Sequence, residues 1–372
     1  MTNLRNMDFR VSRAEIRDLK RRLSQTRWPD ELPGMPWVLG ADLSYVKEVC
    51  KYWQHDFDFK LLQEKVNAHR NVIAEFNGIR VHAMIVESQN PDAVPLMLMH
   101  GWPGSIAEMF DVIEPLRRDH HLVIPSIPGY TLSGPTTKYG VGIFEVADTY
   151  VALMHALGHE RFFIAGGDWG GIIAGQICVR HPESIIGHHS TMLPVFPPAE
   201  NPMDGVTEDE ARLTEKAALF RLTGTGYQAI QSTKPQSLGF ALMDSPAGLA
   251  AWILEKFKEW TYGDVREVFT KQRLLENISL YWFTGTITSS MRLYHEGLGR
   301  GLPIFPMQRV EVPTGHAMFP GEIYPTTKVW AERIFNVVHW TLMDKGGHFA
   351  AMEEPAAYAA DVATFVRKVR GV

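Results

Sequence analysis

The sequence has little cysteine: Cys50 and Cys178 are the only two in 372 residues. They lie far apart in the chain, and neither belongs to a Cys-x-x-Cys pair. Disulfide-stapled secreted domains and cysteine zinc sites both need more numerous or more closely spaced cysteines. We therefore expect neither a disulfide framework nor a zinc site, and a reducing compartment such as the cytoplasm.

An excess of charge of one sign is also lacking. The 37 lysines and arginines nearly balance the 42 aspartates and glutamates, which gives a formal net charge of −5. Neither sign forms a long block, so the composition predicts no nucleic-acid partner.

Long hydrophobic runs are absent as well. No window approaches about 18 uninterrupted apolar residues, the length that a membrane-spanning helix needs. The start, MTNLRNMDFRVSRAEIRDLKRRL, carries charges without the apolar core of a secretory signal. The sequence predicts a soluble protein without a membrane anchor.

The sequence does contain a series of short apolar runs. NVIAEF, IRVHAMIV, PLMLMHG, HLVIPSI and RFFIAGG are separated by turns or by helix-length segments, and RVEVPTG and VVHWTLMD resume the pattern later. Such runs are typical of buried strands in a largely parallel sheet flanked by helices. A last helix carries Val362, Phe365, Val366 and Val369 on one stripe.

This pattern divides the chain into four parts. Residues 1–75 are predicted to wrap the core, beginning with a helix from Ser12 to Leu23 whose Ser12 and Glu15 have capping-box spacing. Residues 76–195 and 299–372 form the two parts of the α/β core. Residues 196–298 contain the aromatic-rich segments GLAAWILEKFKEW and LYWFTGTITSSMRLY, which predict a helical lid inserted into that core.

A glycine-flanked aspartate lies between a predicted strand and a predicted helix. In IAGGDWGG, Gly166, Asp168 and Gly170 fill the pattern G-x-S-x-G, the strained turn on which α/β-hydrolases hold their nucleophile. A glycine-rich turn with a helix-capping aspartate is the simpler alternative. The strand-like RFFIA before the turn and the helix-like GIIAGQICVRH after it favour a nucleophile, and with it an α/β-hydrolase fold.

An aspartate nucleophile changes the reaction. Its attack on an ester carbonyl would give a reactive anhydride, whereas displacement at a saturated carbon gives an alkyl ester of the enzyme. Epoxides and alkyl halides are electrophiles of this kind. Water must then cleave the ester, and that step needs a general base.

The expected base is His348 in DKGGHFAAMEEP, because it follows the last predicted strand and precedes the last helix. An acid should orient its imidazole, and Glu322 in GHAMFPGEIYP occupies the loop after the strand RVEVPTG. By spacing alone, four other acids in the same part of the chain are alternatives: Glu311, Asp344, Glu353 and Glu354.

The stretch MLMHGWPGS follows an early strand and matches the HG-containing loop that supplies an oxyanion-hole N–H in α/β-hydrolases. The expected donors are the backbone N–H groups of Trp102 and of Trp169, which directly follows Asp168. Taken alone, HGWPG is equally compatible with an ordinary tight turn.

Together these stretches resemble the microsomal-type epoxide hydrolases, which include the juvenile-hormone epoxide hydrolases. The likeness extends to GYQAIQSTKPQSLGFALMDSPAGLAAWILEKFKEW, LYWFTGTITSSMRLYHE, VPTGHAMFP and GGHFAAMEEP, and to RWPDELPG and WQHDFDF near the start. The resemblance implies that Asp168 is the nucleophile and that Glu322 and His348 form a charge-relay pair. The sequence departs from the family's pattern at the N-terminus, where we expect no membrane anchor.

The resemblance also implies that two lid tyrosines bind and protonate the epoxide oxygen: Tyr227 in GYQAIQST and Tyr294 in MRLYHE. Independently of the family, a strongly basic alkoxide needs such a donor, and a phenol can supply the proton. The residues alone do not select two of the 11 tyrosines. Tyr262 and Tyr281 in the same segment are equal candidates on that basis.

The expected reaction is hydrolysis of an apolar epoxide to a vicinal diol, with water as the second reactant and without a metal or organic cofactor. One alternative is a haloalkane or haloacid dehalogenase, which uses the same aspartyl ester but usually has asparagine where this chain has Trp102. A second alternative is a non-catalytic binding protein, which would not need the full set of catalytic groups. A homodimer is compatible with the sequence.

Overall fold

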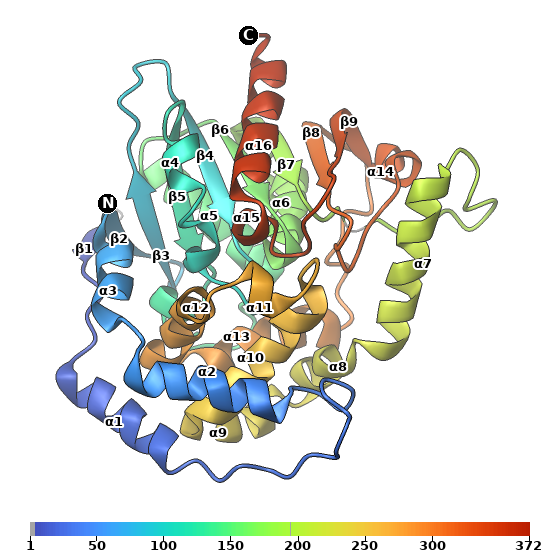
Figure 1. Cartoon of the computed structure of the whole chain (residues 1–372). Helices are drawn as coiled ribbons and strands as arrows, with labels where there is room; N and C mark the ends of the chain where they lie inside the picture. Colours follow the sequence, from blue (N-terminus) through green and yellow to red (C-terminus); the bar gives the residue numbers. More distant parts are fainter. Residues whose placement is uncertain (1–3, 194) are drawn as a thin grey trace.

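The computed structural model describes residues 4–193 and 195–372. Within these residues one nine-stranded sheet runs through the molecule in the order β1-β2-β3-β5-β4-β6-β7-β8-β9 (Figure 1). The strands are β1 (Arg5–Met7), β2 (Arg70–Phe76), β3 (Ile79–Val86), β4 (Val94–Met99), β5 (His120–Ser126), β6 (Phe162–Gly166), β7 (Ile185–Ser190), β8 (Val310–Met318) and β9 (Phe335–Leu342).

Most of the sheet is parallel, as predicted. The pairings from β5 through β4 and β6 to β9 are parallel, whereas β1, β2, β3 and β5 pair in antiparallel fashion. The turn between β2 and β3 explains part of the difference, because Asn77 and Gly78 both have positive φ, 52° and 73°. An Asn-Gly pair with this geometry favours a tight hairpin, so the sequence held a signal for antiparallel pairing.

Helices cover both faces of the sheet (Figure 1). On one face α5 packs beside α6, and α6 contacts β6, β7 and β8, while α16 lies on the other face against β7, β8 and β9. Val362, Phe365 and Val366 of α16 are buried in these contacts, as the apolar stripe predicted. These helices are α4 (Ile113–Leu116), α5 (Ile143–Ala156), α6 (Asp168–Arg180), α14 (Lys328–Ile334), α15 (Ala350–Glu353) and α16 (Pro355–Arg370).

A helical insertion separates β7 from β8. In Figure 1 most of it lies below one end of the sheet, with α12 and α13 under the strands, whereas α7 is drawn at the right. The insertion contains α7 (Glu208–Thr223), α8 (Gly226–Thr233), α9 (Pro235–Asp244), α10 (Pro246–Trp260), α11 (Val265–Val268), α12 (Lys271–Thr284) and α13 (Ile287–Tyr294).

The N-terminal segment packs mainly on this insertion. It begins with α1 (Arg13–Ser24), and the predicted capping box is confirmed, since Ser12 and Glu15 exchange hydrogen bonds of 3.2 and 2.8 Å. Helix α2 (Leu43–His55) buries Val49 and Trp53 and packs against α10 and α12. Helix α3 (Phe59–Asn67) then leads into the sheet.

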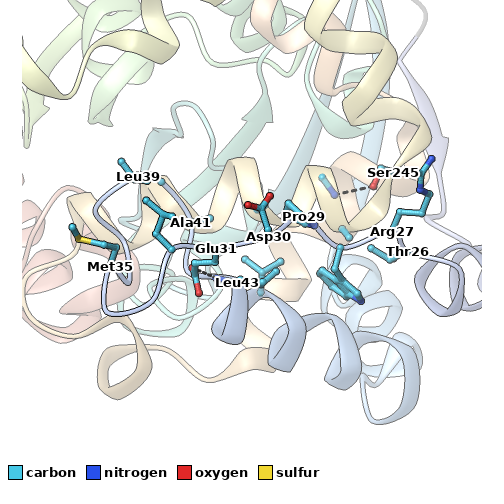
Figure 2. Close-up of a pocket in the computed structure, with 17 residues that line it drawn as sticks. Thr26, Arg27, Pro29, Asp30, Glu31, Met35, Leu39, Ala41, Leu43 and Ser245 are labelled. Atoms are coloured by element: carbon cyan, nitrogen blue, oxygen red, sulfur yellow. Dashed lines mark hydrogen bonds between the residues drawn. The ribbon is translucent and has the colours of Figure 1, made fainter.

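The irregular stretch between α1 and α2 runs along the start of α10 (Figure 2). It leaves a cavity of about 440 Å³ whose lining includes Trp28, Leu32 and Ala247. None of the described residues that line this cavity is a predicted site residue.

In the described part of the chain, no single helix has both the length and the apolar character that crossing a membrane requires. Helices α9 and α10 meet the length and composition test only as a pair, and they are bent by 118° at their junction.

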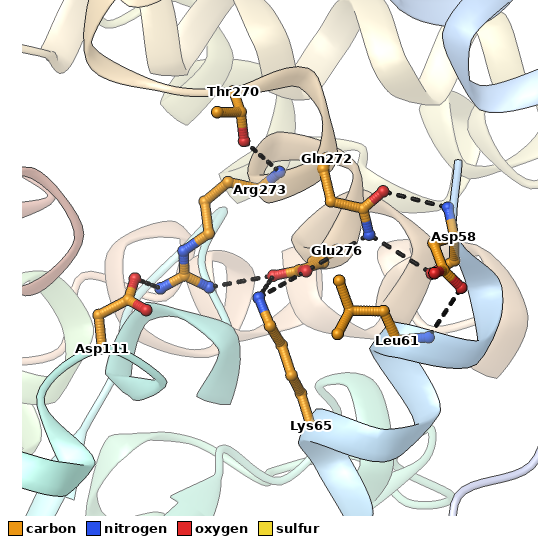
Figure 3. Close-up of polar contacts among 8 residues, drawn as sticks. All are labelled: Asp58, Leu61, Lys65, Asp111, Thr270, Gln272, Arg273 and Glu276. Carbon is orange, nitrogen blue, oxygen red and sulfur yellow. Dashed lines mark hydrogen bonds and ion pairs between the residues drawn. The ribbon is translucent and has the colours of Figure 1, made fainter. Parts of the chain in front are cut away.

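A network of charged side chains joins three parts of the chain (Figure 3). Glu276 of α12, with a fully buried side chain, is 2.7 Å from the Lys65 ammonium of α3 and 3.4 Å from the Arg273 guanidinium. Arg273 also pairs at 2.8 Å with Asp111, an exposed residue of the sheet domain between a short 3-10 turn and α4. The network therefore ties the N-terminal segment and the insertion to the sheet domain.

Glu276→Ala should lower the free energy of unfolding by about 3 kcal/mol, because removal of one member of a buried ion pair leaves uncompensated charge. Urea denaturation measures this change. The matched control is Glu64→Ala, which removes an ion pair with Lys60 whose side chains are 57% and 83% exposed and should cost less than about 1 kcal/mol. Equal losses in the two variants would contradict a structural role for the buried network.

Candidate active site

Asp168 lies at the end of β6 and the start of α6, as the turn pattern predicted. Its φ of 48° is in the left-handed region, a strained conformation for a residue with a side chain. A side chain at Gly166 would approach the Met99 carbonyl oxygen to 2.9 Å, and one at Gly170 would collide with the same strand. The glycines around Asp168 therefore allow the helix and strand to approach closely.

Two loops at the same end of the sheet bring His348 and Glu322 to Asp168. Nε2 of His348 is 3.4 Å from Oδ2 of Asp168, and Nδ1 of His348 is 3.0 Å from both carboxylate oxygens of Glu322. A β-bridge between Gly321 and Gly347 holds the two loops together. The imidazole thus lies between two carboxylates, in the order that base catalysis requires.

The two carboxylates set the charge of the imidazole. Burial alone would lower the pKa of His348, but the Glu322 carboxylate and then the Asp168 carboxylate raise this pKa well above its ordinary value. Proton affinity at His348 therefore depends on whether Asp168 carries its charge.

The alternative acids lie elsewhere. Glu311 has a side chain that is 79% exposed, Asp344 is exposed, and Glu354 pairs with Lys345. Glu353 accepts hydrogen bonds from two backbone N–H groups and supports the loop that carries the histidine. Among the five candidates, the structure places Glu322 against the imidazole.

The HGWPG loop supplies a donor to Asp168. The backbone N–H of Trp102 donates to Oδ1 of Asp168 at 2.7 Å. His100 holds this loop: its Nε2 accepts from the Ile127 N–H at 3.2 Å, so its Nδ1 carries the proton and donates to the Gly101 carbonyl at 2.9 Å. Burial lowers the pKa of His100 to about 4, which keeps it neutral.

Helix α12 fixes the other side of the same loop. Asn277 donates to the Pro103 carbonyl at 2.8 Å and accepts from the Ser105 hydroxyl at 2.6 Å, while Tyr281 donates to the Gly104 carbonyl at 2.6 Å. Sequence reasoning missed Asn277, because its partners are distant backbone groups. Tyr281 is thus occupied as a support for the loop.

Tyr227 and Tyr294 face Asp168 across a cavity of about 390 Å³ that all three line. Their ring centroids are 5.8 Å apart, and the Tyr227 ring stacks on Trp102 at 5.3 Å. The other tyrosine candidates do not line this cavity: Tyr281 binds the loop, and Tyr262 is 46% exposed. The structure therefore brings together the pair that the resemblance implied.

Both phenols keep their protons. Burial, and in addition the nearby Asp168 carboxylate, raises the pKa of Tyr227 well above its ordinary value, and burial does the same for Tyr294. Further polar residues that sequence reasoning did not single out line the cavity, among them Gln228 and Tyr324. Gln228 donates at 2.9 Å to the hydroxyls of both Tyr227 and Tyr324. Tyr324 lies only two residues after Glu322, and this closeness in sequence could have indicated that it reaches the site.

Comparison with known proteins agrees with this fold. A family model described as "alpha/beta hydrolase fold" matches residues 94–355, and one described as "Epoxide hydrolase N terminus" matches residues 4–109. The protein is an α/β-hydrolase, as its sheet, the strained turn at Asp168 and the Asp-His-Glu arrangement also indicate.

Individual relatives specify the family. Epoxide hydrolase 1 of Oryctolagus cuniculus is 34% identical over 403 residues, which cover 98% of this chain and 89% of that protein. The crystal structure of juvenile hormone epoxide hydrolase from the silkworm Bombyx mori has a TM-score of 0.93 and 31% identity, covering 100% of this chain and 96% of the other. An epoxide hydrolase of Aspergillus niger has a TM-score of 0.90 and 26% identity, covering 99% and 97%. The chain belongs to the epoxide hydrolase family, and the dehalogenase alternative is not favoured.

Glu322→Gln should shift the acid limb of the pH–rate profile to lower pH. The amide removes the charge that raises the pKa of His348, so the imidazole stays neutral to a lower pH but is a weaker and less well oriented base. We expect the rate of styrene oxide hydrolysis to fall by about 100-fold or more. Steady-state rates between acid and neutral pH measure both effects, with the exposed Glu311→Gln as control; an unshifted acid limb would contradict the assigned pairing.

Proposed function

We propose that this chain converts apolar epoxides to vicinal diols through an alkyl ester on Asp168. One observation carries the proposal. The Asp168 carboxylate lines a cavity together with two phenols, and its Oδ2 contacts His348, which in turn contacts Glu322. A carboxylate, two proton donors and a base are what ring opening followed by ester hydrolysis requires.

Ring opening is the first step. A carboxylate oxygen of Asp168 bonds to an epoxide carbon from the side opposite the ring oxygen, and the carbon–oxygen bond breaks. Tyr227 and Tyr294 hydrogen-bond the departing oxygen, which takes a proton from one of them. Burial keeps the pKa of both phenols high, so each is protonated and available as a donor.

Ester hydrolysis is the second step. Esterification removes the negative charge of Asp168, one of the two charges that raise the pKa of His348, so this pKa falls when a base is needed. His348 takes a proton from water, and the oxygen bonds to the ester carbonyl carbon. The N–H groups of Trp102 and Trp169 stabilise the resulting oxyanion. When the ester bond breaks, the diol oxygen takes the proton from His348. The other water proton, left on the re-formed Asp168 carboxyl, returns to the phenol that was deprotonated in ring opening.

The cavity walls favour an apolar substrate. A volume of about 390 Å³ is large enough for an aromatic or branched epoxide. Apart from the site residues, the walls are mostly aliphatic and aromatic, including Ile172, Met192, Leu193, Val195, Phe196, Leu298, Ile304 and Phe305.

The proposed reaction assigns a role to each part of the chain. Residues 196–298 act as a lid that brings the tyrosines over the two core parts, residues 76–195 and 299–372, and residues 1–75 wrap the assembly. Residues 1–3 and 194 of these ranges lie outside the described residues. Both cysteines are free and buried, which supports a cytoplasmic location.

The double variant Tyr227→Phe/Tyr294→Phe should slow diol formation from styrene oxide by about 100-fold or more, because the alkoxide leaves without a proton donor. Product analysis by chromatography measures the diol. Tyr262→Phe, which removes an exposed hydroxyl, is the matched control and should retain wild-type activity. Free halide from a chloroalkane, without diol from any of a panel of styrene, stilbene and fatty epoxides, would instead support a dehalogenase.

A further inference from the structure

A second, much smaller cavity touches Asp168. Its volume is about 20 Å³, and its lining includes Asp168, His348 and Glu108. The larger cavity is lined by Asp168 and both tyrosines, whereas His348 is not among the described residues that line it. The nucleophile is therefore shared between one space that contains the proton donors and another that contains the base.

The smaller cavity suits a single water molecule. About 10–15 Å³ of this kind of volume is needed for one water, together with two to four polar partners. The cavity meets the first condition with little to spare, and the side chains of Glu108, His348 and Asp168 offer the partners. The rest of its wall includes apolar groups such as Phe349 and Ala350.

Two glycines make room for carboxyl groups at this place. A side chain at Gly101 would occupy the space of the Asp168 carboxylate, and one at Gly104 would occupy the space of the Glu108 carboxyl. Glu108 belongs to the short 3-10 turn Ile106–Met109, and its side chain folds back toward the HGWPG loop. The HGWPG loop thus contacts two carboxyl groups: the Trp102 N–H donates to Asp168, and Gly104 leaves space for Glu108.

The environment favours the neutral form of this carboxyl. Burial raises the pKa of Glu108 to about 8; His348 opposes the shift and the Asp168 carboxylate adds to it. A neutral carboxyl can both donate and accept a hydrogen bond. It also avoids placing a third negative charge beside the two carboxylates that flank His348.

We propose that the smaller cavity binds the water that hydrolyses the enzyme ester, and that Glu108 holds this water between His348 and Asp168. The inference rests on the proposed function and adds the place from which water attacks. Water gives one proton to His348, its oxygen bonds to the Asp168 carboxyl carbon, and the bond from that carbon to the substrate oxygen breaks. The proton on His348 then passes to the released diol oxygen, and the second water proton, left on the Asp168 carboxyl, returns to the tyrosine that was deprotonated in ring opening. Substrate and water thus reach Asp168 from different spaces.

The test measures ring opening and ester hydrolysis separately, in the whole enzyme with styrene oxide. Single-turnover mixing, acid quenching and intact-protein mass spectrometry give the amount of ester with time. We expect Glu108→Met to open the ring within about three-fold of the wild-type rate but to hydrolyse the ester about 10-fold or more slowly, because the water loses a polar partner. Ester should accumulate in this variant, and Glu108→Gln, whose amide donates and accepts, should hydrolyse it at an intermediate rate.

A second variant moves the carboxyl without removing it. In Gly104→Ala the new methyl group takes the space of the Glu108 carboxyl, so we expect the same accumulation of ester. If Glu108→Met does not fold, Gly104→Ala tests the inference in its place. The control is Glu114→Met, which replaces a side chain that is 72% exposed and should leave both rates unchanged.

His348→Gln separates failure of this inference from failure of the proposed function. If it accumulates ester but Glu108→Met and Gly104→Ala do not, or if these two slow both steps equally, Glu108 does not hold the water and the inference is overturned. If no variant and no wild-type sample ever contains ester, the aspartyl-ester reaction itself is wrong.

Discussion

The strained turn at Asp168 is the constraint on which the site depends. A carboxylate at a left-handed position between a strand and a helix projects from the end of the sheet, where neighbouring loops can reach it. This geometry excludes side chains at three nearby positions. Gly166 and Gly170 lie against β4, and Gly101 leaves room for the carboxylate. The left-handed geometry of the turn therefore depends on glycines that supply no catalytic side chain.

The charges and the burial around this turn determine which groups hold protons. In the proposed reaction, Glu322 keeps its contact with His348, while the charge of Asp168 disappears when the ester forms. The same event that creates the intermediate thus weakens the hold of the imidazole on its proton. The phenols line the larger cavity, where burial preserves their protons, so the proposed donors and the proposed base lie on different sides of one carboxylate.

Much of this arrangement could be predicted from the sequence, because local patterns specify local geometry. The strands, the capping box at Ser12 and the elbow at Asp168 each have such a pattern. The antiparallel edge was missed although Asn77 and Gly78 signalled a hairpin.

Contacts between distant segments could not be predicted in the same way. Nothing near Asn277 or Glu276 indicates that one binds the HGWPG loop and the other lies buried between Lys65 and Arg273. Only family resemblance selected Tyr227 and Tyr294; the fold places both on the cavity that Asp168 lines, and their role as proton donors stays a prediction. The central claim is that a carboxylate oxygen of Asp168 bonds to substrate before water takes part. One turnover of styrene oxide by excess enzyme in ¹⁸O-labelled water tests it most directly: the account predicts an unlabelled diol and label in Asp168, whereas a labelled diol in that first turnover would contradict it.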